Sequence, residues 1–235
     1  MLLGFSKYLL GLYDQVVSKR TYDDSCGIAR ALDLIGDRWT LLVVRELLLG
    51  PKRYTDLQSA LGRIAPDVLA QRLRDLEAGG LAERTELAGP GRARVYRLTG
   101  RGRELQPVLL ALGRFGSRLP LPDHPAELSP DATAVALLTV FRPERAAGVS
   151  ARIALVLGIE RFTVRLDDGR LSIDREPDAD HDALLETTPG VLTQVLWHGL
   201  PTEDAEASGR LRISGDRAAV DAFLGVFSGR LDPVG

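Results

Sequence analysis

Residues 54–97 read YTDLQSALGRIAPDVLAQRLRDLEAGGLAERTELAGPGRARVYR, and this stretch decides the fold of the first half of the chain. Its hydrophobic spacing predicts a short helix that ends at Gly62 and a second helix over Pro66–Ala78, which two glycines terminate. Two further segments flank the glycine-rich residues 89–94, which predicts a β-hairpin with a basic tip. The order is therefore helix, turn, helix and hairpin.

The second helix of this stretch has two different faces. At about 100° per residue its leucines form one narrow stripe, and its polar side chains point the opposite way. The leucines are Leu69, Leu73 and Leu76, and the polar residues are Asp67, Gln71 and Arg74. An amide and a guanidinium on a slim helix can make paired hydrogen bonds to base edges in the major groove of DNA. Solvated helix surface is the alternative interpretation.

Further cations border the same elements. Lys52 and Arg53 precede the first helix, and Arg92 and Arg94 lie at the hairpin tip, where arginines can reach phosphates or the minor groove. A solvated turn or loop is the alternative for these four. Arg72 lies at the edge of the leucine stripe, so a structural role and a phosphate contact are both open. The predicted DNA-contact residues are Lys52, Arg53, Asp67, Gln71, Arg72, Arg74, Arg92 and Arg94.

Charge is distributed unevenly along the chain. Residues 1–120 carry 19 Lys and Arg against 13 Asp and Glu, whereas residues 121–235 carry 11 against 19. A net charge of −2 for the whole chain therefore conceals a basic half and an acidic half. Only the basic half is suited to binding a polyanion such as double-stranded DNA.

The remaining pattern predicts an α+β protein of two domains. Further helices are expected at 27–35, 38–49 (capped by Asp37), 55–61, 100–118 (capped by Thr99), 131–141, 189–198 and 217–227, and strands at 81–85, 94–98, 153–157, 161–166, 171–173, 183–187 and 211–213. Four prolines between 120 and 130 indicate a linker. The expected division is an N-terminal extension at 1–21, a first domain at 22–118, a linker at 119–129 and a second domain at 130–230.

Several classes of protein are not expected. Cys26 is the only cysteine, which excludes an intrachain disulfide and suits a reducing cytoplasm. The apolar start, residues 1–13, is too short to span a bilayer and lacks a signal-peptide cleavage pattern, so no membrane association is predicted. The three histidines lie far apart without metal-ligand spacing, and no nucleophile or phosphate-loop motif occurs, so no metal, cofactor or enzymatic activity is expected.

The first domain resembles the HxlR family of bacterial winged helix-turn-helix transcription regulators. The resemblance covers about residues 22–118 and rests on CGIARAL (26–32), IGDRWTLL (35–42), GPKRYTDL (50–57), LAQRLRDLE (69–77) and YRLTGRG (96–102). Family members usually cap the helix that begins at Pro66 with Ser or Thr, whereas Ala65 stands here. The family pattern begins near Val17, which suggests that residues 1–16 stem from an over-long start assignment.

The resemblance implies a homodimer, built by the first and last helices of the domain, that binds near-palindromic operators and acts as a repressor. Helix 100–118, apolar at Leu105, Val108, Leu109, Leu112 and Phe115, suits such pairing or could cover its own core. Some relatives use an N-terminal cysteine as a redox switch. For Cys26 a buried structural thiol is the favoured interpretation and a redox switch is the alternative.

The second domain resembles the sterol carrier protein type 2-like fold, a sheet covered by helices around an apolar tunnel. The resemblance covers about residues 129–230 and rests on FTVRLDDG (162–169), TP…L…L (188–196) and GRLRISGD (209–216). It implies a hydrophobic small-molecule effector. The candidate lining residues, most of which must also form core, are Leu138, Phe141, Leu155, Phe162, Val164, Leu192, Leu196, Trp197, Phe223 and Phe227.

The favoured function is therefore a cytoplasmic, homodimeric, sequence-specific DNA-binding transcription regulator whose second domain senses an apolar molecule. The alternative is a lipid or metabolite carrier in which the first domain is only a scaffold that does not bind DNA.

Overall fold

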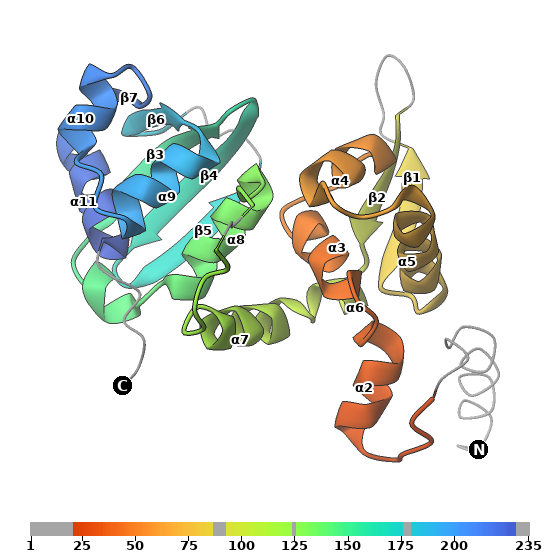
Figure 1. The fold of residues 1–235 in the computed structure, drawn as a ribbon. Helices are drawn as coiled ribbons and strands as arrows, with labels where there is room; N and C mark the ends of the chain where they lie inside the picture. Colours follow the sequence, from red (N-terminus) through yellow and green to blue (C-terminus); the bar gives the residue numbers. More distant parts are fainter. Residues whose placement is uncertain (1–20, 87–92, 124–125, 176–179, 229–235) are drawn as a thin grey trace. The chain divides into compact units, whose positions relative to one another are not determined.

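A computed structural model of the protein describes residues 21–86, 93–123, 126–175 and 180–228 of the 235-residue chain (Figure 1). The chain divides into two compact units, the first ending at Pro107 and the second beginning at Val108. The Arg92 side chain, part of the predicted hairpin tip, and the extension before residue 21 lie outside the described residues. The division expected at linker 119–129 stays a prediction.

The first unit contains a helix-turn-helix followed by a two-stranded antiparallel hairpin (Figure 1, orange to yellow). Its elements are α2 (Gly27–Ile35), α3 (Thr40–Leu47), α4 (Tyr54–Leu61), α5 (Pro66–Ala78), β1 (Ala82–Glu86), β2 (Arg94–Leu98) and α6 (Gly100–Arg103). The predicted bounds of α2, α5 and β2 are confirmed. Gly62 has a φ of +51°, a conformation that glycine adopts without strain, and it ends α4 as expected.

The core of the first unit joins α3 to α5 and to the hairpin. Val43, Val44 and Leu47 of α3 are buried, as is the leucine stripe of α5. Val95 and Leu98 of β2 are buried as well. The hairpin is therefore anchored to the helices by one continuous apolar cluster, which fixes its position beside α5.

Two helix boundaries differ from the sequence-based expectation. Asp37 does not cap α3, which begins at Thr40 after Trp39 has turned the backbone into the left-handed region with φ at +81°. The Asp37 carboxylate instead pairs with Arg72 of α5. The single helix expected over 100–118 is broken into α6 and α7 (Gln106–Gly116). Pro107 explains the break, because proline lacks an N–H and its ring clashes with the carbonyl of the preceding turn.

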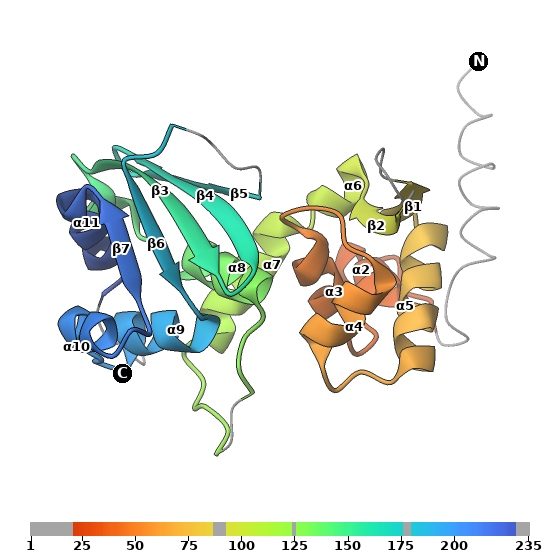
Figure 2. The ribbon, with the colours of Figure 1, turned by 90° about the horizontal axis from the view of Figure 1, so that it is seen from above.

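The second unit is a five-stranded mixed sheet with helices gathered on one face (Figures 1 and 2). Its elements after α7 are α8 (Pro130–Val140), a 3₁₀ turn (Pro143–Ala146), β3 (Ser150–Leu157), β4 (Glu160–Asp167), β5 (Arg170–Asp174), β6 (Ala183–Thr187), α9 (Pro189–Trp197), α10 (Thr202–Ala207), β7 (Arg212–Gly215) and α11 (Arg217–Phe227). The strand order is β5-β4-β3-β6-β7, in which only β3 and β6 are parallel.

Alternation in the strands explains the layered arrangement. Phe162, Val164 and Leu166 of β4 are buried, as their shared face predicts. The predicted cap of the last helix is confirmed, because the Asp216 carboxylate accepts hydrogen bonds from the N–H groups of Ala218 and Ala219. A sheet with one apolar face thus needs only one layer of helices to bury it.

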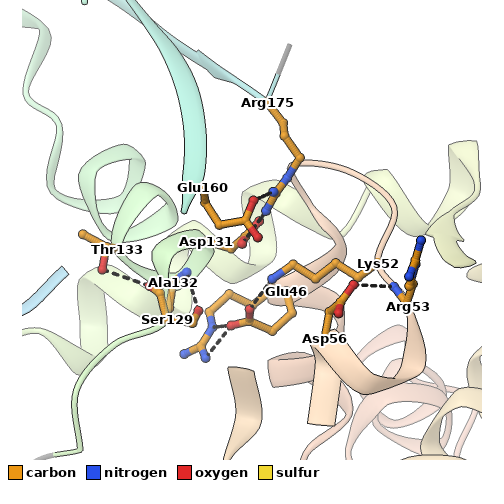
Figure 3. Close-up of polar contacts among 11 residues, drawn as sticks. Glu46, Lys52, Arg53, Asp56, Ser129, Asp131, Ala132, Thr133, Glu160 and Arg175 are labelled. Atoms are coloured by element: carbon orange, nitrogen blue, oxygen red, sulfur yellow. Dashed lines mark hydrogen bonds and ion pairs between the residues drawn. The ribbon is translucent and has the colours of Figure 1, made fainter. Parts of the chain in front are cut away.

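One buried ion pair stands out in the second unit (Figure 3). The Arg175 guanidinium lies 2.5 Å from both carboxylate oxygens of Asp131, whose side chain is buried at the start of α8, and it also pairs with Glu160. Burial opposes the charge on Arg175, but hydrogen bonds and Coulombic attraction from Asp131 and Glu160 outweigh burial and raise the pKa of Arg175. The pair joins α8 to the end of β5.

Candidate nucleic-acid interface

Helix α5 presents the predicted polar face to solvent. Its leucine stripe is buried, whereas Asp67, Gln71 and Arg74 are all exposed. Pro66 occupies the first turn, and Ala65 supplies no side-chain cap, as the sequence indicated. Asp67 therefore provides the one acidic side chain in the first turn, where it interacts favourably with the helix dipole.

The two predicted base-reading side chains are joined by hydrogen bonds. The Arg74 guanidinium donates to Gln71 Oε1 over 2.6 Å, and Gln71 Nε2 donates to Asp75 Oδ1 over 2.7 Å. The Gln71 amide is therefore oriented with its oxygen toward Arg74. One lone pair of the oxygen and one hydrogen of the nitrogen remain, which is the complement that the major-groove edge of adenine requires.

Of the two roles left open for Arg72, a structural role and a phosphate contact, the structure favours the structural one. Its guanidinium pairs with Asp37 before α3 and with Asp75 Oδ2, the latter over 3.0 Å. Only about 15% of its side chain is exposed. Arg72 thus fastens α5 to the turn before α3 and completes a chain of polar contacts with Gln71.

Lys52 corrects the predicted contact set. Its ammonium is buried and lies 2.8 Å from a carboxylate oxygen of Glu46, which is itself fully buried on α3 (Figure 3). Arg45 lies 2.9 Å from the other oxygen of Glu46. Lys52 is therefore a core residue and cannot serve as an exposed phosphate contact. Arg53, the next residue, is exposed as predicted, and its backbone N–H donates to Asp56 over 3.2 Å.

The hairpin brings a further arginine to this surface. Arg94 is exposed, and its side chain lies 3.7 Å from Glu86 on the paired strand. Arg84 of β1 is directly opposite Tyr96 of β2, and its guanidinium carbon lies 5.9 Å from the centre of the tyrosine ring. This cation–π contact holds Arg84 in place at the strand surface.

Three arginines line an open hollow in the first unit. The hollow has a volume of about 460 Å³ and is lined by Arg53, Tyr54, Thr55, Arg84, Arg94 and Tyr96. Lys52 brings its two sides together, because its backbone N–H and C=O exchange hydrogen bonds with Tyr96 over 2.9 and 2.8 Å. The Tyr54 hydroxyl donates to the carbonyl of Pro66 over 2.7 Å, so the hollow borders the first residue of α5.

Sequence reasoning missed Arg84 and the Lys52–Glu46 pair. Arg84 lies opposite Tyr96 in the hairpin. The sequence does not predict this pairing, because the number of residues in the glycine-rich loop, which sets the register of the two strands, is not fixed by the pattern. The turn between Glu46 and Lys52 takes its path from the backbone bridge between Lys52 and Tyr96 of β2. Because Tyr96 is remote in sequence from Lys52, the pattern does not predict the Lys52–Glu46 pair. A glutamate beside Arg45 in the mostly apolar 41–49 segment was the available signal.

Cys26 also differs from the favoured interpretation. The thiol is exposed rather than buried, at the N-terminal end of α2. Backbone N–H groups of Ile28 and, to a lesser degree, Ala29 lower the pKa of Cys26 below its ordinary value. The structure thus overturns the buried structural thiol, and the redox alternative stays a prediction.

We expect Cys26 to be alkylated faster in the folded chain than an ordinary thiol at neutral pH. A lowered pKa raises the thiolate fraction, so the pH midpoint of the reaction with iodoacetamide should lie below that of the unfolded chain. Mass spectrometry across pH measures the rate, and the same chain in urea is the matched control. Equal midpoints for folded and unfolded chains would contradict this expectation.

The ten apolar residues predicted to line a ligand site form part of the hydrophobic core of the second unit. Seven are buried outright, and Leu138, Phe141 and Trp197 are half-buried. Phe223 and Phe227 stack edge to face with ring centres 5.2 Å apart. Neither the arginine-lined hollow nor a second hollow of about 310 Å³ between α3 and β2 is lined by any of the ten.

The described part of the chain contains no cluster of three or more His, Cys, Asp or Glu side chains placed to hold a metal ion. None of its helices combines the length and apolar character needed to cross a bilayer.

The similarity to known proteins covers the helix-turn-helix, the hairpin and helices α6 and α7. Residues 34–122 match the family model described as HxlR-like helix-turn-helix. The chain is 40% identical over 92 residues to an HTH-type transcriptional regulator of Synechocystis sp., covering 39% of this chain and 68% of that relative. It is 39% identical over 99 residues to an HTH-type transcriptional regulator of Mycobacterium bovis, covering 42% of this chain and 62% of that relative.

Among solved structures, the reduced form of the transcriptional regulator YodB from B. subtilis is similar with 29% sequence identity and a TM-score of 0.37. The similarity covers 43% of this chain and 100% of that structure. The family match ends at residue 122, so it leaves the five-stranded unit beyond α7 uncovered.

Proposed function

The chain belongs to the HxlR family of helix-turn-helix transcriptional regulators, and from this premise we propose that it binds a specific DNA duplex as a homodimer and represses transcription. The observation that carries the proposal is the exposed Gln71–Arg74 pair on α5, oriented by Asp75 beside the arginine-lined hollow. In this arrangement α5 lies in the major groove, Gln71 and Arg74 contact base edges, and Arg53, Arg92 and Arg94 contact the backbone or minor groove.

The charge distribution supports a DNA partner for the first unit alone. The first 120 residues carry the excess of Lys and Arg, and three arginines gather at one hollow next to α5. The acidic second half would be repelled by a duplex. A carrier whose first unit is a mere scaffold needs no such exposed amide–guanidinium pair.

Exposed apolar stripes support the homodimer. Val108, Leu112 and Phe115 share one side of α7, and each exposes about half of its surface or more. Ile28 and Leu32 form a similar exposed pair on α2. Apolar stripes of this kind on a helix surface mark interaction sites, and a second copy of the same chain would cover them.

Replacing Phe115 by Glu is expected to weaken dimerisation by roughly tenfold or more, because burying a phenylalanine contributes about 2 kcal/mol. Sedimentation velocity across a concentration series measures the dimer dissociation constant. Arg114→Gln, which makes the same change in net charge on the opposite side of α7, is the matched control and should leave the constant unchanged. A Phe115→Glu chain that remains as dimeric as the wild type would refute this interface.

Arg74→Ala is expected to reduce the preference for a specific duplex. Selection from random duplexes with the wild-type chain first yields the preferred sequence. Losing a guanidinium that contacts a base edge should then cost about 1–3 kcal/mol, or roughly ten- to hundredfold, against that sequence and little against a scrambled one. Fluorescence anisotropy with both duplexes measures the ratio, and Arg101→Gln, an exposed arginine on α6, is the control.

The carrier alternative predicts a different result. A carrier would enrich no sequence from the random pool, and Arg74→Ala would leave the affinity for every duplex unchanged.

For the second unit we propose that the sterol-carrier-like sheet binds a hydrophobic effector. Native mass spectrometry of freshly purified chain, which reports the number of subunits together with any retained ligand, tests that role directly.

A further inference from the structure

The arginine-lined hollow is held in shape by backbone and buried side-chain contacts. Its two sides come from segments far apart in sequence: the residues that begin α4 and the outer surface of the hairpin. The backbone pairing of Lys52 with Tyr96 locks these segments together, and the buried ammonium of Lys52 holds the same residue to α3. Arg53 therefore lies next to the hairpin by construction.

The charges around the hollow are predominantly positive. Among the described residues, no carboxylate forms an ion pair with the guanidinium of Arg53 or Arg84, although both are exposed. Arg94 is only loosely paired with Glu86, at 3.7 Å. Asp56 is the other nearby acid, and its carboxylate already accepts a hydrogen bond from the backbone N–H of Arg53.

The position of Arg84 restricts what it can bind. Its guanidinium is held over the Tyr96 ring, which immobilises the side chain but leaves its N–H donors available at the edge. A planar donor fork beside a second arginine suits the oxygens of a phosphate. The Tyr54 hydroxyl does not compete, because it donates to Pro66.

We propose that this hollow seats a backbone phosphate of the duplex, held by Arg53 and Arg84. The inference rests on the proposed function and extends it to a residue, Arg84, that the sequence did not indicate. Because the Tyr54 hydroxyl ties the hollow to the first residue of α5, a phosphate seated there fixes how far α5 enters the major groove. The contact positions the protein on DNA and carries no sequence information itself.

The test is the salt dependence of binding by Arg84→Gln. Each phosphate contact contributes a slope of about −0.9 to the logarithm of affinity against the logarithm of salt concentration. Arg84→Gln should therefore flatten the slope by about one unit between roughly 50 and 300 mM salt, and weaken binding about fivefold near 150 mM. Selected and scrambled duplexes should lose the same factor, and Arg53→Gln combined with Arg84→Gln should flatten the slope by about two units.

Three results would overturn the phosphate seat. In the first, Arg84→Gln keeps the wild-type slope while Arg101→Gln, the matched exposed control, behaves identically. In the second, Arg84→Gln lowers the ratio between selected and scrambled duplexes, which would make Arg84 a base-reading residue. In the third, millimolar inorganic phosphate binds the wild-type chain but not Arg84→Gln, and it leaves the affinity for the duplex unchanged at constant ionic strength, which would identify a site for a free small anion.

The wild-type chain distinguishes this failure from failure of the proposed function. If it enriches a sequence and shows a normal salt slope, DNA binding stands whatever Arg84→Gln does. Thermal unfolding of each variant by circular dichroism confirms that the exposed substitutions leave the fold intact. A wild-type chain that binds no duplex would remove the proposed function and the phosphate seat together.

Discussion

Replacing Lys52 by Met is expected to lower the free energy of unfolding of the first unit by about 3 kcal/mol. The substitution removes the ammonium that lies 2.8 Å from Glu46, a carboxylate with no exposed surface. Glu46 would keep its ion pair with Arg45, whose side chain is partly exposed. A buried charge that loses a partner costs more than the intact pair contributes, so the effect should be large.

Urea unfolding measures this loss. Trp39 lies in the first unit and Trp197 in the second, so tryptophan fluorescence in a Trp197→Phe background reports the first unit alone. The matched control is the double replacement Glu46→Leu with Lys52→Met, which removes both charges and should recover to within about 1 kcal/mol of the parent. A single Lys52→Met chain as stable as the parent would show that the pair is solvated in solution.

Replacing Arg175 by Met is expected to destabilise the second unit by about 3 kcal/mol. Asp131 is buried at the start of α8, and Arg175 approaches both of its oxygens at 2.5 Å. Removing the guanidinium takes away the cation that contacts both oxygens of this buried carboxylate, and it breaks the ionic link between α8 and the end of β5. Arg175→Lys, which keeps the charge but not the planar fork, should recover part of the loss.

The measurement follows Trp197 fluorescence during urea unfolding in a Trp39→Phe background. Arg212→Met is the control in the same sheet, because Arg212 and Glu186 form an ion pair whose side chains are 75% and 42% exposed. An exposed pair of this kind contributes less than about 1 kcal/mol. If Arg175→Met and Arg212→Met had equal effects, Arg175 would not anchor α8.

Residues that begin or end a helix explain which elements the sequence predicted well. Helix α5 begins at Pro66 and ends before Gly79. Thr188 caps α9, which begins at Pro189, and Asp216 caps α11. Each of these signals acts within one turn of the chain. The leucine stripe of α5 was equally clear, because a periodicity of 3.6 residues places apolar side chains on one face whatever they pack against.

The features that were missed depend on partners remote in sequence. Asp37 suits a helix cap by its chemistry, but Arg72, 35 positions along the chain, draws its carboxylate away. Lys52 resembles a surface cation until the bridge to Tyr96 turns it toward Glu46. The break before α7 is the exception, because Pro107 is a local signal that ends a helix whatever the remote partners are.

The hydrogen bond from Gln71 to Asp75 has a consequence for how such regulators diverge. Arg74 donates to the Gln71 oxygen and Asp75 accepts from the Gln71 nitrogen, so a donor side chain in place of Asp75 would compete with Arg74 for that oxygen and let the amide turn. Two descendants could then favour different bases while keeping identical reading residues. Comparisons of duplicated genes would need to track position 75 as well as the side chains that touch the operator.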